Sequence, residues 1–404
     1  MYNDIYFHNF LKYLIFLIPI SLVSGSLILN INLMLISLAI LLCGFISSKK
    51  LFNQSWLKVA FLFLILQISS SIMNEFYLES LIRSMSFIKF IFLALGINIV
   101  FSHDKKNFFI FFKVLFFIII FVVFDSIIQY FFDQNIFGNP YENNRLSSIF
   151  GDEYIVGSFL CKMIFLITPI FLLFINNLKY KNILLFFWFA GAISIILITG
   201  DRMPSLLFLM GISLYYLFKA YRNPKNLLSI FLIYILCTAI FFLNPAVSKR
   251  FNEISHERYG LTKSFKIKDS QWGAHFLTAW AIFKENPIIG IGAKNFRVES
   301  CKTKYANIDS DKAKQRCTTH PHNIILEILS EHGLLGLFLF LGLLYFIING
   351  VNLNYRHNIF FLISLLICVW PIGTSGSIFT TVNGTFLWIN LGVILYSKDK
   401  KIFK

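Results

Sequence analysis

The chain has 404 residues, of which 57% are hydrophobic and only 14% are charged. A soluble globular protein carries about 25% charged residues, so this composition excludes an ordinary soluble domain and indicates a surface that mostly faces lipid. The formal net charge of +16 does not require nucleic acid, because neither a basic groove interleaved with aromatic residues nor an RNA-binding module is visible. We therefore expect the lipid bilayer, and no nucleic acid, as a partner.

Apolar runs that could cross a bilayer recur along the chain, and lipid admits only helices or closed barrels. They lie near residues 10–24, 26–46, 57–72, 83–101, 107–125, 155–176, 183–199, 204–219, 227–243, 333–350, 358–373 and 384–397. Several are shorter than about 20 residues, so the count of twelve holds to within one. No small-residue cleavage site follows the first run, so no removable signal peptide is expected. The sequence predicts an all-α polytopic protein with a single membrane domain, residues 1–404.

Lysine and arginine set the orientation, because cytoplasmic turns carry an excess of them. With a cytoplasmic N-terminus, the inner turns and the tail hold most of the basic residues: Lys49, Lys50, Lys58, Lys105, Lys106, Lys179, Lys181, Lys219, Arg222, Lys225, Arg356, Lys398, Lys400, Lys401 and Lys404. The outer short turns hold single arginines at most, namely Arg83, Arg145 and Arg202. This bias predicts that both termini are cytoplasmic.

The segment 244–320, between the ninth and tenth spans, is predicted to be an inserted loop on the outer side. Within it, residues 271–285 are predicted to form an amphipathic helix at the membrane interface, because Trp272, Phe276, Ala279, Trp280 and Phe283 recur at helical spacing. Cys301 and Cys317 are the only cysteines outside the spans, and an oxidising outer location favours a disulfide between them. A zinc site that adds His320 and His322 is the alternative, although the spacing matches no standard zinc motif.

The string Thr-Thr-His-Pro-His-Asn at residues 318–323 closes this loop at the start of a membrane helix. Histidine can move a proton near neutral pH, so its presence there points to a reactive site. Pro321 suits the first turn of a helix, so the sequence predicts Thr319 or His320 as the cap and His322 on the helix face. There a neutral imidazole would accept a proton from an alcohol as that alcohol attacks. The alternative is a capping histidine without chemistry, a role that fits His320 better than His322.

Two arginines are expected near the same outer surface. Arg145 precedes the sixth span, and Arg202 lies in the tight turn between the seventh and eighth spans. Arginine binds phosphate through two parallel hydrogen bonds, so both would suit an anionic lipid-linked group beside helix N-termini. The alternative is local pairing, of Arg202 with Asp201 and of Arg145 with Asp152 or Glu153.

Charged residues within or beside the apolar runs are functional candidates by default. Asp125 and Gln129 lie near an outer end and are predicted to hydrogen-bond substrate. Lys89 and Lys162 either reach the interface or pair with a neighbour, and the sequence leaves this choice open.

Four segments, taken in chain order, resemble the O-antigen ligase and polymerase superfamily of bacterial envelope glycosyltransferases. They are Arg145-Leu-Ser-Ser-Ile-Phe150 with Gly157, Thr199-Gly-Asp-Arg202, Trp280 through Glu285-Asn-Pro-Ile-Ile-Gly-Ile-Gly-Ala-Lys-Asn-Phe296, and His320-Pro-His-Asn323 with Gly333-Leu-Leu-Gly336. The last two segments are the specific ones. Asp201 replaces the usual small residue before the second arginine, and Gly151-Asp-Glu153 replaces the usual turn after the first.

The resemblance implies transfer of a glycan from undecaprenyl pyrophosphate to an acceptor hydroxyl on the periplasmic side of the bacterial inner membrane. The implied reaction inverts the anomeric centre and needs no metal, cofactor or nucleotide sugar. By position, His322 would be the general base, and Arg145 and Arg202 would bind the pyrophosphate and stabilise its departure. Supporting residues would be His320, Asn323, Asp152 and Glu153.

The acceptor distinguishes two activities within this resemblance. An O-antigen ligase uses lipid A-core, and an O-antigen polymerase uses another lipid-linked repeat unit. The His-Asn and Gly-x-x-Gly elements resemble the ligase branch, so a ligase is the first expectation and a polymerase the second. A polysaccharide transporter or flippase fits less well, because transporters carry midplane sites between two related halves.

Overall fold

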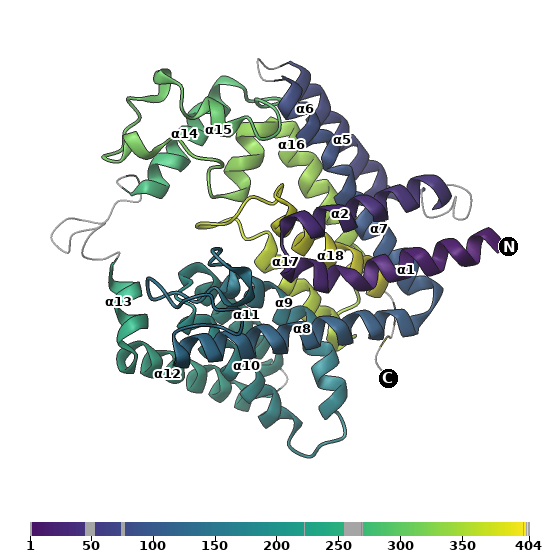
Figure 1. The fold of residues 1–404 in the computed structure, drawn as a ribbon, viewed down its shortest axis with the longest axis vertical. Helices are drawn as coiled ribbons and strands as arrows, with labels where there is room; N and C mark the ends of the chain where they lie inside the picture. The colour runs from purple at the N-terminus through teal and green to yellow at the C-terminus, as the bar shows by residue number, and fades with distance from the viewer. Residues whose placement is uncertain are drawn as a thin grey trace.

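The computed structural model describes residues 2–44, 53–73, 77–221, 223–253, 268, 270–398, 400 and 402. Within these ranges the chain forms helices and no strand, apart from two isolated bridges between residues 134 and 145. The main helices are α1 (Tyr2–Val23), α2 (Ser26–Ala39), α5 (Ser55–Ile72), α6 (Tyr77–Ser86), α7 (Ile88–His103), α8 (Lys105–Phe132), α9 (Val156–Ile175), α10 (Lys181–Ile198), α11 (Arg202–Ala220), α12 (Leu227–Leu243), α13 (Pro245–Glu253), α14 (Gln271–Glu285), α15 (Phe296–Glu299), α16 (Ile324–Ile348), α17 (Arg356–Cys368) and α18 (Thr381–Ser397). Figure 1 shows their arrangement.

A helix lies at each of the twelve apolar runs, and the prediction of an all-α membrane protein is confirmed. In the described part of the chain, nine helical stretches are long and apolar enough to cross a bilayer, whereas α2, α17 and α18 are shorter. The number of spans and their orientation therefore stay predictions. Lys49, Lys50, Arg222 and residues 254–267 of the predicted loop lie outside the described residues.

Small and aromatic side chains are buried between the helices, while many other apolar side chains are exposed on the surface of the bundle. On α12 only Ile233 is buried, while Phe231 and Leu243 are well exposed. Exposed apolar surface of this extent needs lipid around it. Inside the bundle, α7 packs on α18. A Cβ added at Gly392 would lie 3.1 Å from the Ala94 Cα. Small residues permit this close approach, as is typical of membrane helix pairs.

Helix α16 is interrupted at Gly333, and a segment from the long loop fills the interruption. Gly333 has φ +64°, and the N–H groups of Leu334 and Leu335 donate to the carbonyls of Pro287 and Ile288, at 2.8 and 3.1 Å. In return, the N–H groups of residues 291 and 292 donate to the carbonyls of residues 330 and 331. Two N–H groups and two carbonyls beside the break are therefore paired with the loop segment, as burial requires. This exchange fixes the loop on α16.

Helix α14 confirms the predicted helix at 271–285, and it packs on α16 beside α15 (Figure 1). Ser270 caps it, because its Oγ accepts a hydrogen bond from the N–H of Gly273 at 3.0 Å. The face that contains Ala274, Thr278 and Ile282 is buried against the protein, while Trp280 is exposed. Contact of the aromatic face with the membrane remains a prediction.

Candidate active site

A cavity of about 740 Å³ is lined by residues of α2, α5, α6, α7, α9, α15 and α18 and of the loops that precede α9, α15, α16 and α18. Its lining includes five cationic side chains, from Arg83, Lys89, Arg145, Lys294 and Arg297. His322 also lines it, and Glu153 is the one carboxylate among the described lining residues. The excess of positive charge in a walled space suits a ligand with more than one negative charge.

The loop that carries Arg145 is held by polar residues of α8. The Asp125 carboxylate accepts hydrogen bonds from Ser148 Oγ, at 2.6 Å, and from the N–H of Ile136, at 2.9 Å. The Gln129 amide oxygen accepts from the N–H groups of residues 147 and 148. Asp125 and Gln129 are fully buried and bonded to this loop. The prediction that they hydrogen-bond substrate is therefore wrong: they position the loop.

Arg145 pairs with Asp201, across 56 residues of sequence. Its Nη2 also donates to the Tyr154 carbonyl at 2.9 Å, and its guanidinium lies 4.6 Å from the centre of the Tyr154 ring. The second Asp201 oxygen accepts from the N–H of Gly157 at 3.1 Å. The ion pair with Asp201 takes the place of the alternative in which Arg145 pairs locally with Asp152 or Glu153. One carboxylate thus holds Arg145 at the start of α9.

Of the two carboxylates predicted to support the site near Arg145, one lines the cavity. Glu153 does so and is exposed, whereas Asp152 is exposed and does not. Arg202 is the first residue of α11, and its side chain is not part of the cavity lining in this structure. The next residues, Met203 and Pro204, line a smaller neighbouring cavity.

His322 precedes α16 instead of lying on it. The helix begins at Ile324, and its N-cap is Asn323, whose Oδ1 accepts from the N–H of Leu326 at 3.0 Å. The prediction that Thr319 or His320 caps the helix is therefore wrong, because asparagine two residues after Pro321 caps it instead. His322 has φ +57°, and its carbonyl accepts from the N–H of Ser375 at 2.8 Å. This left-handed conformation is uncommon for a residue with a side chain.

Asn323 supports this geometry with its amide group. Its Nδ2 donates to the carbonyls of Pro371 and Gly373, at 2.7 and 3.2 Å. These bonds attach the loop between α17 and α18 to the first residue after His322. Asn323 is therefore a structural anchor for His322.

Two imidazole rings and an indole surround the His322 ring. The ring centroids of Trp272, His275 and His320 lie 4.8, 5.3 and 4.0 Å from that of His322. His275 Nε2 lies 2.9 Å from the Gln315 carbonyl and so must carry its proton there. His320 Nδ1 is bonded to the Thr319 hydroxyl at 3.0 Å. The cluster fixes the His322 ring from three sides.

Burial lowers the pKa of His322 to about 3, with a smaller effect from His320 and His275. Burial likewise lowers the pKa of His320 to about 4. Both imidazoles are neutral at physiological pH in the absence of ligand, which is the form that a base requires. The lowered pKa also makes each imidazole a weaker base, and a bound anion would raise the pKa again.

A second cavity of about 270 Å³ shares part of its lining with the first. The residues common to both are Ser158, His322, Gly376 and Asn383. His320, Trp272 and Lys162 line the smaller cavity but not the larger one. Lys162 donates to Asn383 Oδ1 at 2.6 Å. His322 therefore stands where two cavities meet.

Lys294 was not identified as a candidate from the sequence, although it lies within the Gly-Ile-Gly-Ala-Lys segment. It is 9% exposed, pairs with Glu327 at 3.3 Å and donates to Ser377 Oγ. Its φ of +61° is, like that of His322, uncommon for a residue with a side chain. Two such residues in one cavity are a signal of function, because strained backbone is retained where it serves a site. Lys89 also reaches this cavity, where it donates to Asn30 Oδ1 at 2.7 Å.

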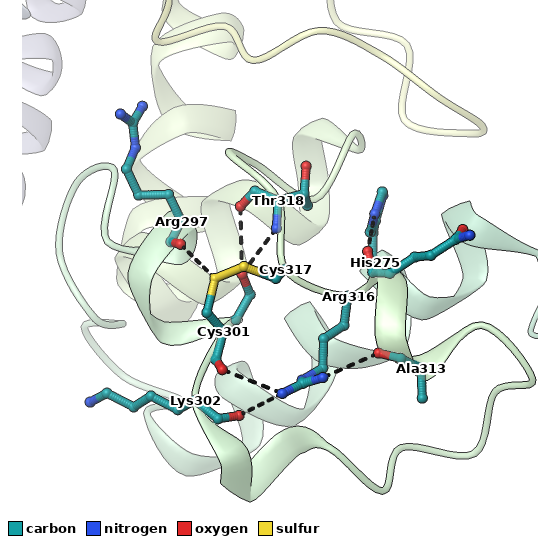
Figure 2. Close-up of a disulfide and its surroundings, with 10 residues drawn as sticks. His275, Arg297, Cys301, Lys302, Ala313, Arg316, Cys317 and Thr318 are labelled. Carbon is teal, nitrogen blue, oxygen red and sulfur yellow. Dashed lines mark hydrogen bonds between the residues drawn. A yellow bond between two sulfur atoms is a disulfide. The ribbon is translucent and has the colours of Figure 1, made fainter.

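Cys301 and Cys317 form a disulfide in the structure, with their Cα atoms 4.5 Å apart (Figure 2). Both sulfurs are consumed in this bond, so they are not thiolate ligands for the alternative zinc site. Arg316 adds two hydrogen bonds, to the carbonyls of Cys301 and Lys302 (Figure 2). The segment that leads to His322 is thereby closed into a loop against α14 and α15.

Residues 184–341 match the family model described as O-antigen ligase, and no curated protein matches the chain. The match covers less than half of the chain, and it contains Arg202, His275, Lys294 and His322 but not Arg145. The two specific motifs and the broken helix α16 up to Leu341 fall within it. Residues 184–341 are therefore similar to the O-antigen ligase family, and this match confirms the resemblance to the O-antigen ligase and polymerase superfamily of membrane glycosyltransferases.

Proposed function

We propose that this protein transfers a glycan from undecaprenyl pyrophosphate to an acceptor hydroxyl, as an O-antigen ligase of the bacterial inner membrane does. The observation that carries the proposal is the position of His322 between a cavity with five cations and a smaller, mostly neutral one. The donor has a charged leaving group and the acceptor hydroxyl is uncharged. The two substrates therefore suit two such cavities, with a base between them. The family match supports the reaction class.

The larger cavity would hold the pyrophosphate of the donor. Arg145 is already fixed by Asp201 and lines this space. Lys294 and Arg297 lie on the opposite, loop-derived wall. Charge that is in place before the substrate arrives stabilises the departing pyrophosphate without further reorganisation. Arg202 remains a second pyrophosphate ligand in this proposal because it follows Asp201 directly in the chain.

The smaller cavity would present the acceptor hydroxyl. The hydroxyl oxygen attacks the anomeric carbon while its proton passes to the neutral His322 imidazole. The bond from that carbon to the pyrophosphate oxygen breaks, and the pyrophosphate leaves with its negative charge. A single displacement of this kind inverts the anomeric centre. Helix α14 carries Trp272 against His322, and Trp272 lines this smaller cavity, so α14 would form part of the wall on the acceptor side.

The decisive experiment follows surface glycans in a strain that lacks this protein and is complemented with variants. Loss of a ligase leaves free lipid-linked polymer, and loss of a polymerase leaves single repeats on lipid A-core. We expect the ligase pattern, and we expect His322→Ala to reproduce it while the variant stays at normal level in the membrane. The polymerase pattern would mean that the acceptor is another lipid-linked repeat unit instead of lipid A-core. Full transfer by His322→Ala would exclude His322 as the base.

A further inference from the structure

A third cavity, of about 670 Å³, lies at the far ends of the helices that help to form the active site. It is lined by the end of α9, the start of α10, the end of α11 and the start of α17. The opposite ends of α9, α11 and α17 carry Ser158, Met203 and Ile367, which line the active-site cavities. Helices of 13 to 20 residues separate the two regions, by about 1.5 Å per residue. This cavity is therefore no part of the catalytic site.

Three cations from three different helices line this cavity. Lys181 comes from α10, Lys219 from α11 and Arg356 from α17. Lys219 Nζ donates to the Asn182 amide oxygen at 2.9 Å, a neutral partner that leaves its charge uncompensated. The described residues of the lining include no carboxylate, and the three chain segments that build it, 169–185, 215–226 and 353–360, contain no Asp or Glu. Positive charge is thus concentrated without an internal counter-charge.

The walls of the same cavity are amphipathic. Side-chain amides of asparagine, among them Asn176, Asn223 and Asn354, add hydrogen-bond donors beside the cations. Apolar lining residues lie next to them and are also exposed on the outside of the bundle, with Leu173 at 36%, Phe218 at 39% and Leu353 at 45% exposed. A ligand that fits has an anionic head with hydrogen-bond acceptors and an apolar tail that runs out along the helices.

We propose that this cavity binds the phosphate headgroup of an anionic phospholipid of the bilayer. Topology alone explains lysines and arginines on one side of a membrane protein, because cytoplasmic turns collect them. It does not explain their convergence around a concave space that lacks carboxylates. Basic pockets between membrane helices are sites for lipid headgroups, and the Arg356 guanidinium matches phosphate oxygens. The bound lipid would join α10, α11 and α17 at the end away from catalysis.

The test uses the purified full-length protein in a non-ionic detergent and native mass spectrometry. Phosphatidylglycerol and phosphatidylcholine with the same acyl chains are compared, with inorganic phosphate as a third ligand. We expect phosphatidylglycerol to be retained in preference, and the variant Lys181→Gln/Lys219→Gln/Arg356→Gln to weaken its binding more than roughly tenfold. A matched control, Lys105→Gln/Lys106→Gln/Lys398→Gln, removes three charges on the same predicted side and should bind like the unaltered protein.

Three outcomes would overturn the proposal. They are equal retention of phosphatidylcholine, unchanged binding by the triple variant, and binding of inorganic phosphate that blocks the lipid at the same site with no contribution from the tail. Lys181→Gln alone, at a partly exposed position, keeps the test valid if the triple variant does not fold. Because the readout is lipid retention, it is independent of glycan transfer and of the proposed function.

Discussion

Asp201 holds Arg145 by an ion pair in which the carboxylate is 8% exposed and the guanidinium 24% exposed. The same carboxylate accepts the N–H of Gly157, so Asp201 joins the loop before α9 to the first turn of that helix. Asp201 is one of the two places at which the sequence departs from the pattern of the superfamily that it resembles. Its effect is to set the position of the arginine that faces the larger cavity.

We expect Asp201→Asn to reduce glycan transfer, because the amide keeps the shape but loses the charge that fixes Arg145. Arg145→Lys should reduce transfer as well, since an ammonium group cannot make the same paired hydrogen bonds. If both act through one pair, the double variant is little worse than the more impaired single variant. Initial transfer rates of the three variants, at equal membrane level, decide this. Independent, multiplicative losses would show that Asp201 does not act through Arg145.

Arg202→Lys tests the second proposed pyrophosphate ligand separately. A guanidinium that contacts the pyrophosphate cannot be replaced by lysine without loss, so transfer should fall as it does for Arg145→Lys. The comparison is made on the same donor at several concentrations. A normal rate for Arg202→Lys together with a reduced rate for Arg145→Lys would remove Arg202 from the site and leave Arg145, Lys294 and Arg297.

Gly157→Ala should disturb the same pair from its other side. A Cβ at this position would lie 2.6 Å from Thr199 Oγ1 and 2.7 Å from the Asp201 carboxylate. Overpacking of this kind costs about 1–3 kcal/mol, and it displaces Asp201 from Arg145. We expect lower thermal stability and lower transfer. Gly191→Ala is the matched control, because nothing lies within 4 Å of its added Cβ; equal behaviour of the two variants would contradict the packing argument.

The helices could be predicted because apolar runs report lipid contact directly, but the partners of polar residues could not. Asp125 and Gln129 were assigned to substrate because buried polar groups in a membrane helix suggest function. Their bonds to residues 136, 147 and 148 depend on how a loop folds back, which periodicity does not encode. The pair of Arg145 and Asp201 joins positions 56 residues apart, beyond the reach of local pattern reasoning.

At the His-Pro-His-Asn string, the predicted helix cap was wrong, and the role of His322 as the base stays a prediction. A proline often begins a helix, yet here Asn323 is the cap and His322 takes a left-handed conformation before it. Lys294 was overlooked because a lysine in a predicted outer loop looks solvated. Only the fold shows that it is buried beside Glu327 and faces the same cavity as His322.

His322→Ala should lower the transfer rate by about 10²–10⁴-fold, the usual contribution of a general base. His320→Ala is the comparison, because His320 contacts the same ring and has no base role in the proposal. We expect it to lose much less activity. Rates are measured with purified protein and a lipid-linked donor. Comparable losses in the two variants would assign the base role to the pair instead of to His322.

The pH dependence of kcat/KM tests the buried state of the base. An unperturbed histidine has a pKa of about 6.5 and would lose half of its base form there. Since burial lowers the pKa of His322 to about 3, the neutral form persists as the pH falls below 6.5. We expect kcat/KM to stay level between about pH 8 and pH 5.5, because this ratio reports the free enzyme. A decline centred near pH 6.5 would show that His322 is solvated before the donor binds.

Gly333→Ala should be the most damaging glycine substitution in α16, because two requirements meet at this residue. Its φ of +64° is unfavourable for alanine, and the added Cβ would overlap the backbone of Ile288. The segment 287–292 would then leave the break in the helix, and the carbonyls of Ser330 and Glu331, two buried residues, would lose their donors. We expect loss of folded protein, or loss of transfer in whatever protein remains. Gly342→Ala, in the same helix, meets its nearest atom at 3.8 Å and should be tolerated. A normal protein level and normal activity of Gly333→Ala would mean that the hydrogen bonds between the segment 287–292 and the break in α16 are not needed to hold His322 in place.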